Sequence, residues 1–189
     1  MRYVPLIELP VLVLLVLIRA AMLRRQGVKA LVFGRTDKSD FLLVPVMAFF
    51  LYALLAAVFN WPFPELLKRP FWEAEIFYWT ASVLCTASLV WFALTLKTFG
   101  RSFRVGIDEE TNDKLITDGT FALSRNPIYV GFMAFFLGVF LAYPGIVTLV
   151  FLAFFSAAIH RQVLREEKFL KSRYGDGYEA YCKGTRRYL

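Results

Sequence analysis

Two clusters of polar side chains in the second half of the sequence have residue types and a spacing that could do chemistry. The first, residues 124–129, reads Ser-Arg-Asn-Pro-Ile-Tyr, and the second, residues 161–167, carries two arginines and two adjacent glutamates. Between them lie two apolar blocks, 127–143 and 145–159, with a Pro-Gly pair at their junction. Pro-Gly is a strong turn signal, so the blocks predict a tight helical hairpin. We therefore expect the two polar clusters to meet where the feet of that hairpin come together.

Asn126 and Pro127 predict the start of a helix, because asparagine is a favoured N-cap and proline suits the first helical position. The first turn of a helix offers free N–H groups and the positive end of the helix dipole, which favour a bound carboxylate. Glu166 and Glu167, at the other foot of the hairpin, could bind a cation or an amine. A site that takes both groups suits an amino-acid-like ligand, and the methionine part of S-adenosyl-L-methionine is one example.

The elements that must position these clusters are membrane-spanning helices. The sequence of 189 residues is 58% hydrophobic with a mean hydropathy of +0.54, and its apolar residues are concentrated in blocks. A helix needs about 20 mostly apolar residues to cross the hydrocarbon core of a bilayer. The predicted fold class is therefore all-α, a multi-pass membrane bundle of about five transmembrane helices with a short helical hairpin and a cytoplasmic C-terminal helix. The expected spans are residues 4–23, 41–59, 76–96, 127–143 and 145–159.

Basic residues indicate the orientation of the bundle. Five Lys or Arg residues lie in 24–40, two in 60–75, five in 97–126 and eight in 160–189. Cytoplasmic loops carry an excess of such residues, so all these segments except 60–75 should face the cytoplasm. The N-terminus then lies outside and the C-terminus lies in the cytoplasm. The expected location is the plasma or inner membrane of a prokaryote, or the endoplasmic reticulum of a eukaryote.

The composition disfavours several other classes of protein. The net charge of +7 could indicate a nucleic-acid partner, but the basic residues flank the apolar blocks, where membrane lipids explain them better. Arg186 and Arg187 in the tail are expected to meet such anionic lipids. No metal is expected, because the single histidine and the two cysteines lack a ligand spacing. A transporter is disfavoured because the spans hold almost no ionisable residues and show no internal repeat.

The second half of the chain, about residues 97–189, resembles the isoprenylcysteine carboxyl methyltransferases and, more distantly, the phospholipid and small-thiol membrane methyltransferases. Four motifs carry the resemblance, and the hairpin falls between the second and the third. They are KLITDGTF at 114–121, SRNPIYVG at 124–131, EEKFL at 166–170 and YGDGYEAY at 174–181. The resemblance divides the chain into a substrate-side scaffold of three transmembrane helices, residues 1–96, and a catalytic half, residues 97–189.

The resemblance implies that the chain binds S-adenosyl-L-methionine and that its substrate is lipid-like or prenylated. Arg125 and a basic residue near the foot of the last span, Arg161 or Arg165, would orient an anionic group of the substrate, and Glu167 or a water could take a proton from an amine acceptor. The family usually has histidine at position 126, whereas Asn126 cannot titrate near neutrality and should not act as a base. The residues that would hold the cofactor are Asp113, Lys114, Leu115, Ile116, Phe121, Asn126, Pro127, Ile128, Tyr129 and Glu166.

The expected function is S-adenosyl-L-methionine-dependent methyl transfer at the boundary between membrane and cytoplasm. An isoprenylcysteine carboxylate, a phospholipid amine and a small thiol all remain open as the methyl acceptor. A non-catalytic membrane scaffold that kept the methyltransferase fold is the main alternative. A small-solute transporter is a further alternative.

Overall fold

The fold is all-α, as predicted. The computed structural model describes residues 1–25, 43–99 and 115–189. Over these residues the chain forms seven α-helices and one short 3-10 helix, η3. Their bounds are α1 (Val4–Arg25), α2 (Leu43–Phe59), α3 (Glu65–Lys68), α4 (Glu75–Phe99), η3 (Gly119–Ala122), α5 (Pro127–Ala142), α6 (Ile146–Tyr174) and α7 (Asp176–Gly184).

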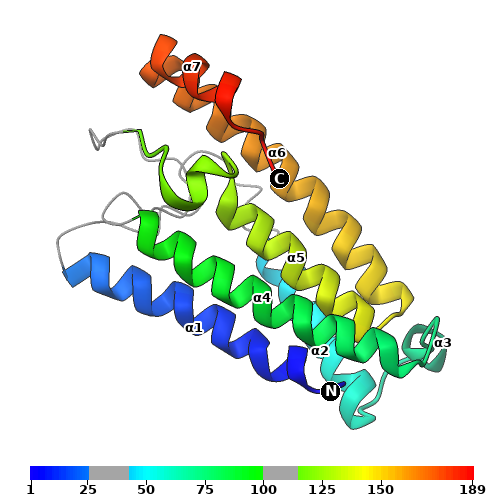
Figure 1. Ribbon diagram of the computed structural model, residues 1–189. Coiled ribbons are helices and arrows are strands. Elements are labelled where there is room, and N and C mark those ends of the chain that lie inside the picture. The colour runs from blue at the N-terminus through cyan, green and yellow to red at the C-terminus, as the bar shows by residue number, and fades with distance from the viewer. Residues whose placement is uncertain (26–42, 100–114) are drawn as a thin grey trace.

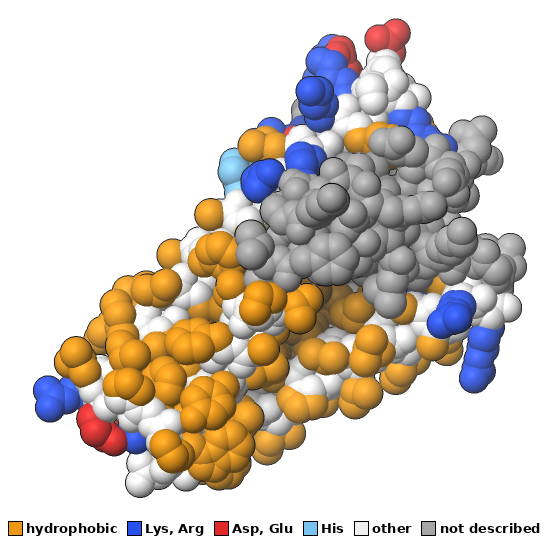
Figure 2. Space-filling model, turned by 180° about the vertical axis from the view of Figure 1, so that it is seen from behind, with side chains coloured by type: hydrophobic (Ala, Val, Ile, Leu, Met, Phe, Trp, Pro, Cys, Tyr) orange, Lys and Arg blue, Asp and Glu red, His pale blue; other side chains and the backbone are white. Residues whose placement is uncertain are grey.

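Three of the helices are long and apolar enough to cross a membrane. These are α1 with 22 residues, α4 with 25 and α6 with 29, whereas α2 and α5 are apolar but shorter, with 17 and 16. Large apolar side chains such as Ile7, Val83 and Val90 are exposed on the outside of the bundle, where a bilayer would cover them. Figure 2 shows hydrophobic side chains over much of the body of the molecule, with charged side chains gathered mainly toward its ends.

The helices alternate in direction along the bundle. In Figure 1, α1, α4 and α6 run from the end that holds the N-terminus toward the end that holds the C-terminus, and α5 returns between them. The last turns of α1 and α4, the 3-10 helix η3, the start of α5 and the helix α7 gather at the C-terminal end, called here the polar end. The described residues that lead into or out of the predicted basic segments therefore share one end of the bundle.

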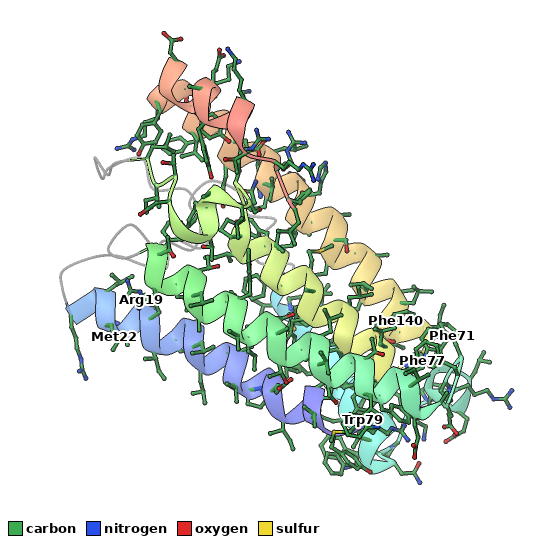
Figure 3. All side chains as sticks on the ribbon, in the orientation of Figure 1. Arg19, Met22, Phe71, Phe77, Trp79 and Phe140 are labelled. Carbon is green, nitrogen blue, oxygen red and sulfur yellow. The ribbon has the colours of Figure 1, made fainter. Side chains whose placement is uncertain are left out.

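Aromatic side chains mark the opposite end. Figure 3 shows Phe71, Phe77 and Phe140 there, whereas Arg19 lies toward the polar end. The ring of Trp72 lies 4.9 Å from that of Phe77 and 5.4 Å from that of Phe140, centre to centre. Aromatic rings are enriched where a membrane meets water, so this cluster suits one interface of the bilayer.

The helix that forms the second arm of the hairpin is longer than the apolar block that predicts it. The apolar block ends at residue 159, whereas α6 runs without a break from Ile146 to Tyr174. Neither proline nor glycine interrupts this stretch, so the helix continues past the apolar part and carries polar side chains beyond it. The helix ends at Tyr174 with Gly175 as its C-cap, and the φ of 51° at Gly175 is a conformation that glycine adopts readily.

Aromatic packing joins α5 and α6 below their polar feet. The ring of Phe136 on α5 lies 5.1 Å from that of Phe151 and 4.6 Å from that of Phe155, both on α6. Phe50 on α2 stacks on Phe151 at 3.8 Å. Phe136 is only 4% exposed, so it is a packing residue of the apolar core.

Close packing of α5 against α4 fixes the other side of the hairpin. A Cβ atom at Gly138 would overlap the Cys85 sulfur and would lie 3.2 Å from the Ala81 carbonyl oxygen, so only glycine fits there. Nearer the polar end, the Trp91 indole N–H donates to the Pro127 carbonyl at 2.7 Å. The start of α5 is therefore held in place by α4.

One acidic residue, Glu8, lies inside the first predicted span. The Thr86 hydroxyl of α4 donates to Glu8 Oε1 of α1 at 2.6 Å, so the carboxyl group links two helices. The pairing fits the rule that polar groups at membrane depth find partners on neighbouring helices.

Candidate active site

The two polar clusters meet at the polar end, as their spacing predicts. Asn126 is the N-cap residue of α5 and Pro127 is its first residue. The Asn126 amide nitrogen donates to Glu167 Oε1 of α6 at 3.1 Å, and the Tyr129 hydroxyl donates to Glu166 Oε1 at 2.6 Å. The two feet of the hairpin are therefore joined by side-chain hydrogen bonds to two adjacent carboxylates.

Glu167 is the centre of the first of two networks. Arg125 Nη2 lies 3.2 Å from its Oε1, and the Nε and Nη2 atoms of Arg187 lie 3.0 and 2.9 Å from its Oε2. The side chains of Glu167 and Arg125 are each 12% exposed, and that of Arg187 is 38% exposed. Both carboxylate oxygens of Glu167 thus accept from cationic groups, of which Arg125 is largely shielded from water and Arg187 is partly exposed.

Glu166 is the centre of the second network, which faces α5. Its Oε1 accepts from Tyr129 at 2.6 Å and from the Gln162 amide nitrogen at 2.8 Å. Arg165 Nη2 in turn donates to Gln162 Oε1 at 2.5 Å. Neighbouring residues on a helix point about 100° apart, because an α-helix has 3.6 residues per turn. Glu166 and Glu167 can therefore serve separate partners from one turn of α6.

The Asn126 side chain does not cap its own helix. It occupies the N-cap position, but it makes no capping hydrogen bond, and its amide nitrogen donates instead to Glu167 Oε1 and, at 3.2 Å, to the Arg187 carbonyl. The first N–H groups of α5 are therefore not satisfied by the residue that would usually satisfy them.

The other residues singled out in the sequence lie in three kinds of place. Pro127 is fully buried and Ile128 packs against the apolar core, so both support the start of α5 from inside. Phe121 is 8% exposed, and its ring meets that of Phe99 edge to face at 4.9 Å. Arg161 is exposed on α6. Leu115 and Ile116 are partly buried, and Asp113 and Lys114 lie outside the described residues.

The short helix α7 closes over η3. The Tyr181 hydroxyl donates to the Phe121 carbonyl at 2.6 Å, and Arg125 Nη1 donates to the Cys182 carbonyl at 3.4 Å. Burial raises the pKa of Tyr181 to about 12, and burial together with the charge of Glu167 raises the pKa of Tyr178 well above its usual range. Both phenols are therefore neutral at physiological pH and can act only as hydrogen-bonding groups.

Some buried polar atoms near this closure have no hydrogen-bond partner among the described residues. They are Thr120 Oγ1, Arg125 Nε and Tyr178 Oη, the last of which lies beside the Cys182 thiol. Buried polar atoms in folded proteins nearly always have a partner, so such groups suit contact with a polar ligand or with water. The residues present thus fit a polar molecule held between the start of α5, α6 and α7.

Sequence reasoning missed the residue that completes the Glu167 network. Arg187 was expected to meet anionic lipid, whereas its guanidinium pairs with Glu167. The one available signal was the need of an inward-facing carboxylate for more than one cation, since a buried charge is costly unless it is paired. That need did not indicate which of the basic residues would supply the second cation.

Comparison with known proteins identifies relatives of the segment that builds this site. A sequence model described as phospholipid methyltransferase matches residues 76–177. A protein-S-isoprenylcysteine O-methyltransferase of Schizosaccharomyces pombe is 36% identical over 87 residues, which cover 44% of this chain and 37% of the relative. Probable proteins of the same name from Oryza sativa, subspecies indica and japonica, are each 34% identical over 128 residues, or 64% of this chain and 62% of the relative.

The matches cover less than two thirds of each of these relatives, 37% of the S. pombe protein and 62% of each rice protein. No solved structure gives a significant match.

Proposed function

Because the chain belongs to the phospholipid methyltransferase family, we propose that it transfers a methyl group from S-adenosyl-L-methionine to a lipid-like acceptor. The observation that carries this proposal is the juxtaposition of an uncapped helix start, at α5, with two carboxylates of α6. A scaffold without a ligand would gain stability from a capped helix, whereas a binding site needs those N–H groups open. The scaffold alternative is therefore disfavoured.

The proposed binding mode follows from the charges of the site. The open N–H groups at Ile128 and Tyr129 would donate hydrogen bonds to the carboxylate of the amino-acid part of the cofactor, and Glu166 would face its ammonium group. Phe121, Leu115 and Ile116 would supply apolar contact, with Asp113 and Lys114 as proposed neighbours. When bound, the cofactor supplies a methyl group on a positively charged sulfur. The residues of the chain bind it, orient it and exclude water.

The hydrogen bonds that Glu167 already accepts affect which kind of methyl acceptor the site suits. An amine must lose a proton before it is methylated, and Glu167 is the proposed proton acceptor for that case. Both of its oxygens, however, already accept from Arg125, Arg187 and Asn126. A carboxylate acceptor needs no base, so we propose an acceptor of that kind, as in the names of the S. pombe and rice relatives. Arg161, which is exposed, is the proposed contact for its negative charge, and Arg125 would hold Glu167 in place.

This choice of acceptor can be tested with the purified full-length protein and a donor that carries a labelled methyl group. We expect label to appear on an S-farnesyl-cysteine analogue with a free carboxylate, at a rate at least tenfold above that for phosphatidylethanolamine in matched vesicles. The same analogue with an amidated carboxyl group is the control, and it should take no label. Faster transfer to phosphatidylethanolamine would instead establish the amine as the acceptor.

We further propose that the bundle crosses the membrane five times, with α2 and α5 as short spans and the polar end in the cytoplasm. The described residues that lead into or out of the basic segments share one end of the bundle, which supports this orientation. Cys182 of α7 is partly exposed at the polar end, whereas Cys85 is buried. A maleimide that cannot cross membranes should therefore label Cys182 in inside-out vesicles and not in right-side-out vesicles. The reverse pattern would invert the proposed topology, and a Cys182→Ser protein is the control for specificity.

A further inference from the structure

The five residues that follow α7, 185–189, form a segment called here the C-terminal strap, and it lies against the start of α5. The Arg125 backbone N–H donates to the Arg186 carbonyl at 2.9 Å. The Ser124 hydroxyl and the Asn126 amide nitrogen donate to the Arg187 carbonyl at 3.3 and 3.2 Å. The strap thus contacts three consecutive residues immediately before α5.

Arg187 holds the site with its side chain as well as with its backbone. Its guanidinium places two nitrogen atoms within 3.0 Å of Glu167 Oε2, while its carbonyl accepts from Asn126. The hydrogen bond to Glu167 raises the pKa of Arg187 above its already high value, so the guanidinium stays charged. One residue therefore fixes both Asn126 and the carboxylate that Asn126 contacts.

The contacts that hold Asn126 decide whether its side chain can cap the N–H groups at the start of α5. An asparagine at an N-cap position ordinarily turns its side chain back to cap the helix, which stabilises the helix. Here the Asn126 side chain is drawn away by Glu167 Oε1 and the Arg187 carbonyl. If the strap were released, Asn126 could cap α5 and occupy the N–H groups that a ligand carboxylate needs.

We propose that Arg187 is a positioning residue of the methyltransferase site, which keeps the N-terminus of α5 uncapped by holding Asn126 and Glu167 together. This inference rests on the proposed function, because it assumes that those N–H groups receive the cofactor. Contact with lipid alone would not account for the two contacts of Arg187. Its carbonyl accepts from Asn126 on one foot of the hairpin, and its guanidinium pairs with Glu167 on the other.

The test is a double-mutant cycle read by calorimetric titration of the detergent-purified full-length protein with S-adenosylhomocysteine. Arg187→Gln should weaken binding about tenfold, because the uncharged amide cannot make the charge-assisted hydrogen bonds that hold Glu167. In an Asn126→Ala background, where no side chain can cap α5, the same change should cost less than threefold. Non-additivity of this kind separates positioning through Asn126 from a general loss of structure.

Two further variants keep the test decisive. Lys183 is exposed on α7, so Lys183→Gln removes the same charge from the same region and should leave the affinity unchanged. Arg187→Lys, which keeps the charge without the paired donors, should give an intermediate loss and serves if the glutamine variant does not fold. Equal losses for Arg187→Gln in both backgrounds, or a wild-type affinity in Arg187→Lys, would overturn the inference alone. A wild-type protein that bound neither donor nor product would overturn the proposed function with it.

Discussion

Replacing Glu167 with glutamine should lower the stability of the unliganded protein more than any other single change at the polar end. The substitution leaves the guanidinium of Arg125, with a side chain only 12% exposed, without its carboxylate partner. Removal of one member of a buried ion pair costs about 3–5 kcal/mol. The share due to Arg187 is smaller, because its side chain is 38% exposed and water screens its charge.

The thermal-unfolding midpoint of the protein in detergent measures this effect. Glu179→Gln is the matched control, since it breaks a surface ion pair with Lys171 in which both side chains are at least half exposed. The control should leave the midpoint close to that of the wild type. Similar midpoints for Glu167→Gln and Glu179→Gln would mean that the Glu167 network contributes little to the fold.

Replacing Glu166 with glutamine should have the largest effect on cofactor binding and little effect on the fold. The amide oxygen of glutamine can still accept from Tyr129, which now donates to Glu166 Oε1 at 2.6 Å, so the contact between α5 and α6 persists. The negative charge that would face the ammonium group of the cofactor is lost. A charge-assisted hydrogen bond contributes about 1.5–3 kcal/mol, which corresponds to a loss of affinity of about 10- to 100-fold.

Calorimetric titration with S-adenosyl-L-methionine measures this loss, and the unfolding midpoint of the same sample checks the fold. Tyr129→Phe is an informative companion, because it removes the hydrogen bond to Glu166 but keeps the charge, and it should weaken binding less. An affinity of Glu166→Gln within twofold of the wild type would rule out the assignment of Glu166 to the ammonium group.

The meeting of the two hairpin feet was predictable from sequence, because it depends on local signals. The Pro-Gly pair at 144–145 indicated the turn, and Asn126-Pro127 indicated the helix start. The two apolar blocks are of similar length, so an antiparallel hairpin brings their polar feet together. The contacts of Asn126 with Glu167 and of Tyr129 with Glu166 confirm that geometry, although they do not test the roles proposed for these residues.

The contribution of the strap was not predictable in the same way. Arg187 is 20 residues from Glu167 along the chain, and a change of direction at Gly175 and the whole of α7 lie between them. Much of the contact is made by the backbone carbonyls of Arg186 and Arg187, which every residue type carries. Backbone hydrogen bonds of this kind leave no trace in composition or spacing, so the tail was interpreted from its charge alone.

Two other differences between the expectations from sequence and the structure have physical reasons. The last apolar span and the helix expected after it form one continuous helix, α6, because hydropathy marks where a helix leaves the membrane and not where the helix ends. Asn126 was expected to cap α5, but a carboxylate and a carbonyl compete for its amide, and they prevail over the local cap. In the case of Asn126, partners outside the local segment decided the outcome.

The most direct test of the central claim compares two ligands on the wild-type protein. S-adenosyl-L-methionine carries the amino-acid part that the start of α5 and Glu166 are proposed to recognise, whereas 5′-methylthioadenosine has the same nucleoside and lacks that part. Calorimetric titration should give saturable binding of S-adenosyl-L-methionine, and binding of 5′-methylthioadenosine at least 100-fold weaker. Equal affinities would contradict the proposed site, and the absence of binding by either compound would contradict the proposed function.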